Sequence, residues 1–190
     1  MQPLYLHLDR IGDLKRGDVL ELQRRMDSNG LSAYGGMFCQ DFIRHLEDLC
    51  QAGLSYHGIS YLFRNFETSR AFRADLILKE LNLEYVRWKN KIDEPSRFQS
   101  LFAFTDKEDA LKFAQDNKAY PTIYEVEPLG RFFKADMNYS RYPNYAKQYW
   151  RGKSMCDDND RRQIWECLLE LPVKIIKPMK LIPTFAFEEE

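Results

Sequence analysis

The stretch that most constrains the fold runs from Pro95 to Phe104 and is followed directly by Thr105-Asp106-Lys107-Glu108. Aromatic and polar residues alternate through it after a proline, which is typical of a β-strand. The Thr-x-x-Glu sequence that follows is a capping-box pattern, typical of the first turn of a helix. The sequence therefore predicts a strand that ends at Phe104 and a helix that begins at Thr105 and runs to Asp116.

Two side chains are unusual in this predicted strand. Ser100 shares one face with Phe98, Phe102 and Phe104, because alternate residues of a strand point to the same side. Arg97 lies on the other face of the same extended segment. Packing alone does not explain why the Ser100 hydroxyl lies among phenylalanines or why the Arg97 guanidinium lies close to it.

The N-terminal segment from Leu4 to Arg10 also alternates, with three leucines on one face. The other face carries Tyr5, His7 and Asp9. This pattern predicts a half-buried strand whose leucines meet the core. His7 then points away from that core, and Arg10 lies on the leucine side.

A third alternating segment, Ile164 to Leu171, lies near the C-terminus. Trp165, Cys167 and Leu169 make one face wholly apolar, and Glu166 lies on the other face with Glu170. A carboxylate in such a strand is placed either at an exposed rim or in a cleft.

The remaining pattern predicts an α+β fold in one domain of 190 residues. Apolar residues at helical spacing predict a helical layer, inserted at about 38–90, that packs beside the strands. Its helices are expected at 38–51, 55–64 and 69–89. Further strands are expected at 19–22, 121–128, 173–176 and 181–187.

The three alternating strands carry a resemblance to known enzymes. The Pro-Ser-Arg-Phe-Gln-Ser core at 95–100 resembles that of a bacterial group and, more distantly, the chain resembles ADP-ribosyltransferases. Those enzymes place three motifs on separate strands around an NAD cleft: His or Arg, then a Ser- or Tyr-bearing strand, then Glu. The resemblance implies an ADP-ribosyltransferase-like split β-sheet, with His7, Ser100 and Glu166 in those three places.

The resemblance also implies roles for these side chains. Glu166 would be the catalytic carboxylate, and His7 would orient NAD. Arg97 would contact a phosphate, and Ser100 the ribose or nicotinamide. The second motif departs from the usual patterns, so Ser96 or an aromatic residue such as Phe102 is an alternative to Ser100 there.

Residues 131–153 combine basic and aromatic side chains. Such a mixture is able to hold phosphates and stack on bases, with Trp150 and Tyr149 as candidates for stacking. The alternative is a packing helix whose charges are solvated. The first interpretation favours RNA or DNA over protein as the acceptor of ADP-ribose.

The amino-acid composition argues against several other classes of protein and site. The net charge of −1 argues against a general polyanion binder. The four cysteines include no C-x-x-C pair, so no metal site is expected. No apolar run is long enough for a membrane span, and we expect a cytoplasmic protein.

The leading hypothesis is an NAD-dependent ADP-ribosyltransferase that acts as a bacterial or phage-defence toxin, with an antitoxin or immunity partner. One alternative is a non-catalytic module that binds RNA or protein on the same fold. Another is an RNA 2′-phosphotransferase, which needs a basic phosphate pocket.

Overall fold

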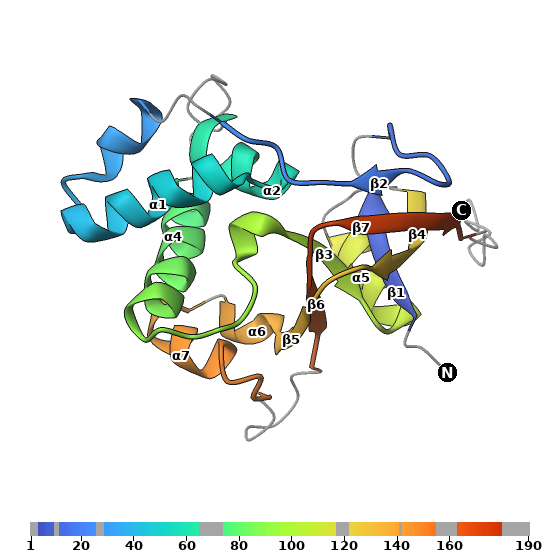
Figure 1. Ribbon diagram of the computed structural model, residues 1–190. Coiled ribbons are helices and arrows are strands. Elements are labelled where there is room, and N and C mark those ends of the chain that lie inside the picture. The colour runs from blue at the N-terminus through green and yellow to red at the C-terminus, as the bar shows by residue number, and fades with distance from the viewer. Residues whose placement is uncertain are drawn as a thin grey trace, which may run out of the picture.

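The computed structural model describes residues 4–9, 12–25, 29–64, 74–116, 122–140, 142–154 and 163–179. These residues form a mixed α+β fold with one antiparallel sheet, to the right of most helices in Figure 1. The expected strand at 181–187, Arg10 and the start of the helix expected at 69–89 lie outside the described residues.

Seven strands are described, in the sheet order β2-β7-β4-β1-β3-β6-β5. Their bounds are β1 Tyr5–Asp9, β2 Val19–Leu20, β3 Ser100–Phe104, β4 Thr122–Pro128, β5 Phe132–Asp136, β6 Trp165–Glu170 and β7 Val173–Pro178. The strands that carry His7, Ser100 and Glu166 are therefore three consecutive neighbours, β1, β3 and β6. Every neighbouring pair is antiparallel.

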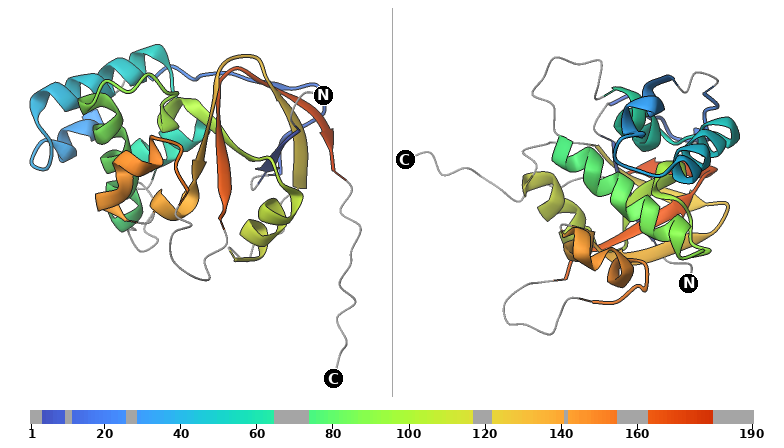
Figure 2. Two further views of the ribbon diagram at one scale, coloured as in Figure 1. Left: turned by 90° about the horizontal axis from the view of Figure 1, so that it is seen from below. Right: turned by 90° about the vertical axis from the view of Figure 1, so that its left-hand side faces the viewer.

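The sheet is folded into two halves, β2-β7-β4-β1 and β3-β6-β5. Four strand spacings, about 19 Å in a flat sheet, separate β6 from β7. Yet only Leu171 and Pro172 connect them, a link that spans about 11 Å at most. Leu129, between β4 and β5, donates its N–H to the Pro172 carbonyl at 3.2 Å, so both turns lie at one end. The halves diverge from these turns, as the left view of Figure 2 shows.

The two halves meet through only one position of the ladder between β1 and β3. Leu6 pairs with Phe104, and no further pair joins these two strands among the described residues. By contrast, β1 pairs with β4, and β3 with β6, at five positions each. β1 and β3 thus share the shortest ladder between neighbouring strands of the described sheet.

Helices cover the outer faces of both halves. α5 (Lys107–Asp116) packs on Leu6, Leu8 and Ile123 of the first half. On the second half, α4 (Ala74–Lys89) and α7 (Ala146–Tyr149) pack on Phe133 and Leu168. The other described helices and turns are 3₁₀ Asn29–Tyr34, α1 Gln40–Ala52, α2 Tyr56–Ile59, π Ser60–Arg64, 3₁₀ Arg97–Gln99, α6 Met137–Ser140 and 3₁₀ Pro143–Tyr145.

The inner faces of the two halves share a core. Tyr5, Val126 and Ile175 come from the first half, and Ala103 and Leu169 from the second. β1 is therefore buried on both faces, whereas its alternation predicted a half-buried strand. Leu6 and Leu8 face outward under α5, and the tyrosine and histidine face inward.

Three predicted details are wrong. Residues 97–99 form a 3₁₀ turn before β3, because the Ser96 hydroxyl accepts the Phe98 N–H and starts a turn. The helix after β3 is capped by Asp106 rather than Thr105, since the Asp106 carboxylate accepts the N–H groups of Glu108 and Asp109. Finally, β5 occupies the start of the segment 131–153, for which a packing helix was one of the two alternatives.

Candidate functional site

Arg97 is the centre of a buried cluster of charged side chains. It is 3% exposed, and its guanidinium makes four hydrogen bonds to protein atoms. Nε and Nη2 donate to the two Glu80 oxygens at 2.6 and 2.9 Å. Nη1 donates to Glu166 Oε1 at 2.7 Å and to the Tyr149 hydroxyl, which in turn donates to Glu166 Oε1 at 2.9 Å.

Four elements bring these groups together. Glu80 comes from α4, Tyr149 from α7, Glu166 from β6, and Arg97 from the 3₁₀ turn. Glu166 points to the outer face of the second half because it is opposite Phe104 in the ladder and shares its face. The cluster therefore lies between that face and the helices.

A close approach of α2 fixes the 3₁₀ turn. A Cβ on Gly58 would be 2.3 Å from the Phe98 carbonyl oxygen, so only glycine fits there without a backbone shift. The Ser55 N–H and hydroxyl donate to the same carbonyl at 2.8 and 3.0 Å.

Aromatic rings border the charged cluster. The Arg97 guanidinium carbon lies 4.6 Å from the centre of the Phe102 ring. The His57 ring lies 4.4 Å from Phe102 and 4.3 Å from Tyr61, and its Nε2 is 3.3 Å from Glu80 Oε2. His57, Tyr61 and Phe102 are only partly buried, so they form the accessible side of the cluster.

In this cluster, burial and the neighbouring charges shift the pKa values in opposite directions. Burial lowers the pKa of His57 and outweighs the opposite effect of Glu80. Burial would raise the pKa of Glu80, but Arg97 and His57 hold it well below its usual range. Burial would lower the pKa of Arg97, but Glu166 and Glu80 raise it. The cluster thus places two carboxylates, Glu80 and Glu166, on a single guanidinium.

Glu84, one turn after Glu80 on α4, anchors a second group. It accepts hydrogen bonds from His45 at 2.9 Å, from the Ser96 hydroxyl at 2.9 Å and from Arg87 Nε at 3.1 Å. Burial would raise the pKa of Glu84, but the His45 and Arg87 hydrogen bonds lower it. Two carboxylates of α4 thus hold the consecutive residues Ser96 and Arg97.

His7 lies where β1 and β3 diverge. Its Nδ1 is 2.8 Å from the Phe102 carbonyl oxygen, beyond the last ladder pair of these strands. His7 points to the inner face of the sheet, whereas Glu166 points to the outer face. The Phe102 residue connects the two sides, because its carbonyl contacts His7 and its ring contacts Arg97.

Two further candidates are core residues in this structure. The Ser100 hydroxyl donates to the Ser96 carbonyl at 2.7 Å and is 1% exposed. Trp150 is 3% exposed, donates to the Leu83 carbonyl at 2.8 Å and stacks on Phe133.

The structure thus brings Arg97, Phe102 and Glu166 into one cluster. Neither Glu80 nor His57 was selected from the sequence. One signal was present: Glu80 and Glu84 lie one turn apart beside the buried Ile77 and Leu81 of α4. Acidic residues at core spacing in a helix imply buried partners.

Comparison with known proteins places the chain in a family. Residues 5–181 match the model of a family described as protein of unknown function (DUF2441), and the chain belongs to that family. No curated protein matches it. None of the helices in the described part of the chain has the length and apolar character to cross a membrane.

Proposed function

We propose that the protein is an NAD-dependent ADP-ribosyltransferase with an ADP-ribosyltransferase-like split sheet, acting in the cytoplasm. The observation that supports this most is the order β1-β3-β6. The strands with the three expected motifs are direct neighbours, and β1 and β3 share a single paired position. In the resembled enzymes the three motifs surround one NAD cleft, so neighbouring motif strands are what this proposal requires.

In the proposed site, NAD lies where β1 and β3 diverge. For a ligand to meet both His7 on the inner face and Glu166 on the outer face, the His7–Phe102 contact between β1 and β3 would have to open. Phe102 lies at this contact on β3, and its ring contacts the partly exposed His57 ring, which in turn stacks on Tyr61. Nicotinamide would stack on these rings, and Trp150 takes no part.

The proposed transfer of ADP-ribose requires a fixed negative charge on the enzyme rather than a strong nucleophile. The bond between ribose C1′ and the nicotinamide nitrogen breaks, and nicotinamide leaves with the electron pair. An acceptor oxygen or nitrogen then bonds to C1′ and loses its proton. Glu166, held by Arg97 and Tyr149, would stabilise the positive charge on the ribose.

Arg97 acts in this scheme on Glu166 rather than on a phosphate. Its four hydrogen bonds to Glu80, Tyr149 and Glu166 would have to be broken before it bound one. The same observation weighs against the RNA 2′-phosphotransferase alternative, because that activity needs a basic phosphate pocket and Arg97 is already paired with carboxylates.

We also propose a macromolecular acceptor, with nucleic acid preferred to protein, and a toxin role with an antitoxin or immunity partner. The basic and aromatic segment 131–153 supports a nucleic-acid acceptor less well than its composition suggested. Tyr149 and Trp150 are buried, and Arg131 binds Glu170.

The second candidate is a non-catalytic binding module. It is favoured by the burial of Glu166, which is 3% exposed and already paired with Arg97. The two candidates differ in whether nicotinamide is released. We expect the wild type to release nicotinamide from NAD, Glu166→Gln to lose this activity, and Glu170→Gln on the same strand to retain it.

Calorimetric titration with NAD separates chemistry from folding in this experiment. A Glu166→Gln protein that unfolds cooperatively and binds NAD, but releases no nicotinamide, supports the transferase. Absence of both NAD binding and nicotinamide release in the wild type would favour the binding module.

A further inference from the structure

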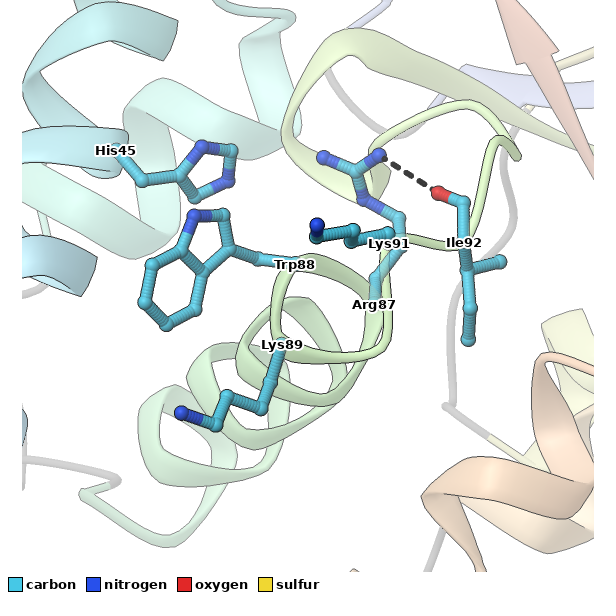
Figure 3. Close-up of a pocket in the computed structure, with 6 residues that line it drawn as sticks. All are labelled: His45, Arg87, Trp88, Lys89, Lys91 and Ile92. Atoms are coloured by element: carbon cyan, nitrogen blue, oxygen red, sulfur yellow. Dashed lines mark hydrogen bonds between the residues drawn. The ribbon is translucent and has the colours of Figure 1, made fainter.

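A cationic pocket lies at the C-terminal end of α4, in addition to the Arg97 cluster. It has a volume of about 470 Å³, which is within the range of small-molecule sites. Its lining residues are His45, Arg87, Trp88, Lys89, Lys91 and Ile92. Figure 3 shows the His45 ring over the Trp88 indole and the Lys91 side chain beside them.

The pocket has a rigid frame. Arg87 donates to Glu84 and, through Nη1, to the carbonyls of Ile92 and Glu94 at 3.5 and 3.1 Å. These bonds tie the segment after the helix to the helix itself. Arg87 is therefore occupied in holding the pocket, which leaves the two lysines to meet a ligand.

Lys91 occupies a position that normally favours glycine. After α4, the Ile92 N–H donates to the Arg87 carbonyl at 3.0 Å and the Lys91 N–H to the Trp88 carbonyl at 3.1 Å, as in a helix-ending Schellman motif. Lys91 has φ of 51°, the left-handed conformation that glycine adopts most easily. A lysine at this position costs stability, and its side chain lines the pocket.

The two lysines and the two rings of the pocket indicate which kind of ligand it binds. Lys89 and Lys91 are exposed, and neither has a carboxylate partner within the described ranges. The Trp88 and His45 rings stack at 5.9 Å with 23° between their planes. Ammonium groups beside a half-buried indole suit a phosphate that carries a flat, stacking group.

We propose that this pocket binds one nucleotide unit, with the phosphate on Lys89 and Lys91 and the base against Trp88 and His45. The unit comes either from a single-stranded nucleic acid or from a free nucleotide. The binding needs neither NAD cleavage nor Glu166, so it stands apart from the proposed transfer reaction.

Fluorescence anisotropy with labelled single-stranded RNA and DNA oligonucleotides tests this proposal. The double variant Lys89→Gln/Lys91→Gly removes both ammonium groups. We expect it to bind about tenfold more weakly, with a slope of log affinity against log salt shallower by about 0.7, because one phosphate contact is lost. The matched control Lys107→Gln/Lys112→Gln removes the same charge from the exposed face of α5 and should bind like the wild type.

In the single variant Lys91→Gly, stability and affinity for oligonucleotides are expected to change in opposite directions. Lys91→Gly relieves the left-handed residue, so its unfolding midpoint should rise while its affinity falls. Competition then identifies the ligand. Oligonucleotides that compete far better than AMP indicate a strand, equal competition indicates a free nucleotide, and either result supports the site.

Three results would overturn the proposal. They are no binding of any oligonucleotide or AMP by the wild type, equal loss in the double variant and the α5 control, and competition by inorganic phosphate as strong as by AMP. The last would show that the rings contribute nothing.

Discussion

Arg97 and Glu166 form a buried ion pair, with 2.7 Å between Nη1 and Oε1, that joins the turn before β3 to strand β6. The pair links two residues that are 69 positions apart in the chain. Glu80 and Tyr149 complete the coordination of the guanidinium, so β3, β6, α4 and α7 all meet at this residue.

Replacing Arg97 should destabilise the protein strongly. Arg97→Met leaves Glu80 and Glu166 buried without their cation, which typically costs about 3–5 kcal/mol. Arg131→Met is the control, because Arg131 also binds two acidic residues but its side chain is 53% exposed. Its loss should cost about 1 kcal/mol or less. Equal urea midpoints for the two variants would show that the buried cluster contributes no more to stability than the exposed Arg131 ion pairs.

The α2 contact predicts a sharp difference between two glycines. Gly58→Ala places a methyl group against the Phe98 backbone, and overpacking of this kind costs about 1–3 kcal/mol. Gly36→Ala meets no atom within 4 Å and should change stability by about 0.5 kcal/mol or less. Thermal unfolding of both variants measures the difference. A Gly58→Ala protein as stable as Gly36→Ala would show that α2 does not approach the turn this closely.

Stability should fall as the pH is lowered from neutral. The pKa of His57 is below its ordinary value of 6.5 in the folded protein, so below pH 6.5 the unfolded chain binds the extra proton first. His57 therefore contributes stability above pH 6.5 that is lost toward its lowered folded pKa. Glu80, with a pKa well below 4.5, adds a loss in the same direction at lower pH.

The His57 contribution is measured by comparing wild type with His57→Gln. Urea unfolding at a series of pH values below 6.5 should give a steeper dependence for the wild type, by at most about 1.4 kcal/mol per pH unit. Identical slopes would show that His57 takes up its proton equally easily in both states.

His7 should stabilise the junction between β1 and β3. His7→Leu removes the hydrogen bond to the Phe102 carbonyl and should cost about 1 kcal/mol. His7→Asn keeps a donor at a similar position and should recover part of this stability. If the two variants unfold at the same denaturant concentration, the imidazole contact contributes nothing to stability.

The elements that alternate or repeat clearly were predictable. β1, β3 and β6, the helix from Gln40 to Ala52 and the helical block before β3 follow directly from period-two and helical spacing. The strand β5 was missed because Phe132–Asp136 is short and precedes a tyrosine-rich segment with several possible periods. The turn at 97–99 was missed because a serine cap competes with an extended conformation over few residues.

The cluster was only half predictable. Arg97, Phe102 and Glu166 were expected at the site from the resemblance and do meet, but Glu80 and His57 come from helices distant in sequence. Their positions depend on how α2 and α4 pack on the sheet, which no local pattern contains. The burial of Trp150 and Ser100 is tertiary information of the same kind.

The measurement that tests the central proposal most directly is transfer of label from NAD. Purified protein is incubated with NAD labelled in its adenylate part and with separate pools of RNA, DNA and protein, alongside Glu166→Gln and the Glu170→Gln control. We predict label in one pool, with nucleic acid preferred, for the wild type and Glu170→Gln, and none for Glu166→Gln. Absence of transfer to every pool, or equal transfer by Glu166→Gln, would contradict a transferase that depends on this carboxylate.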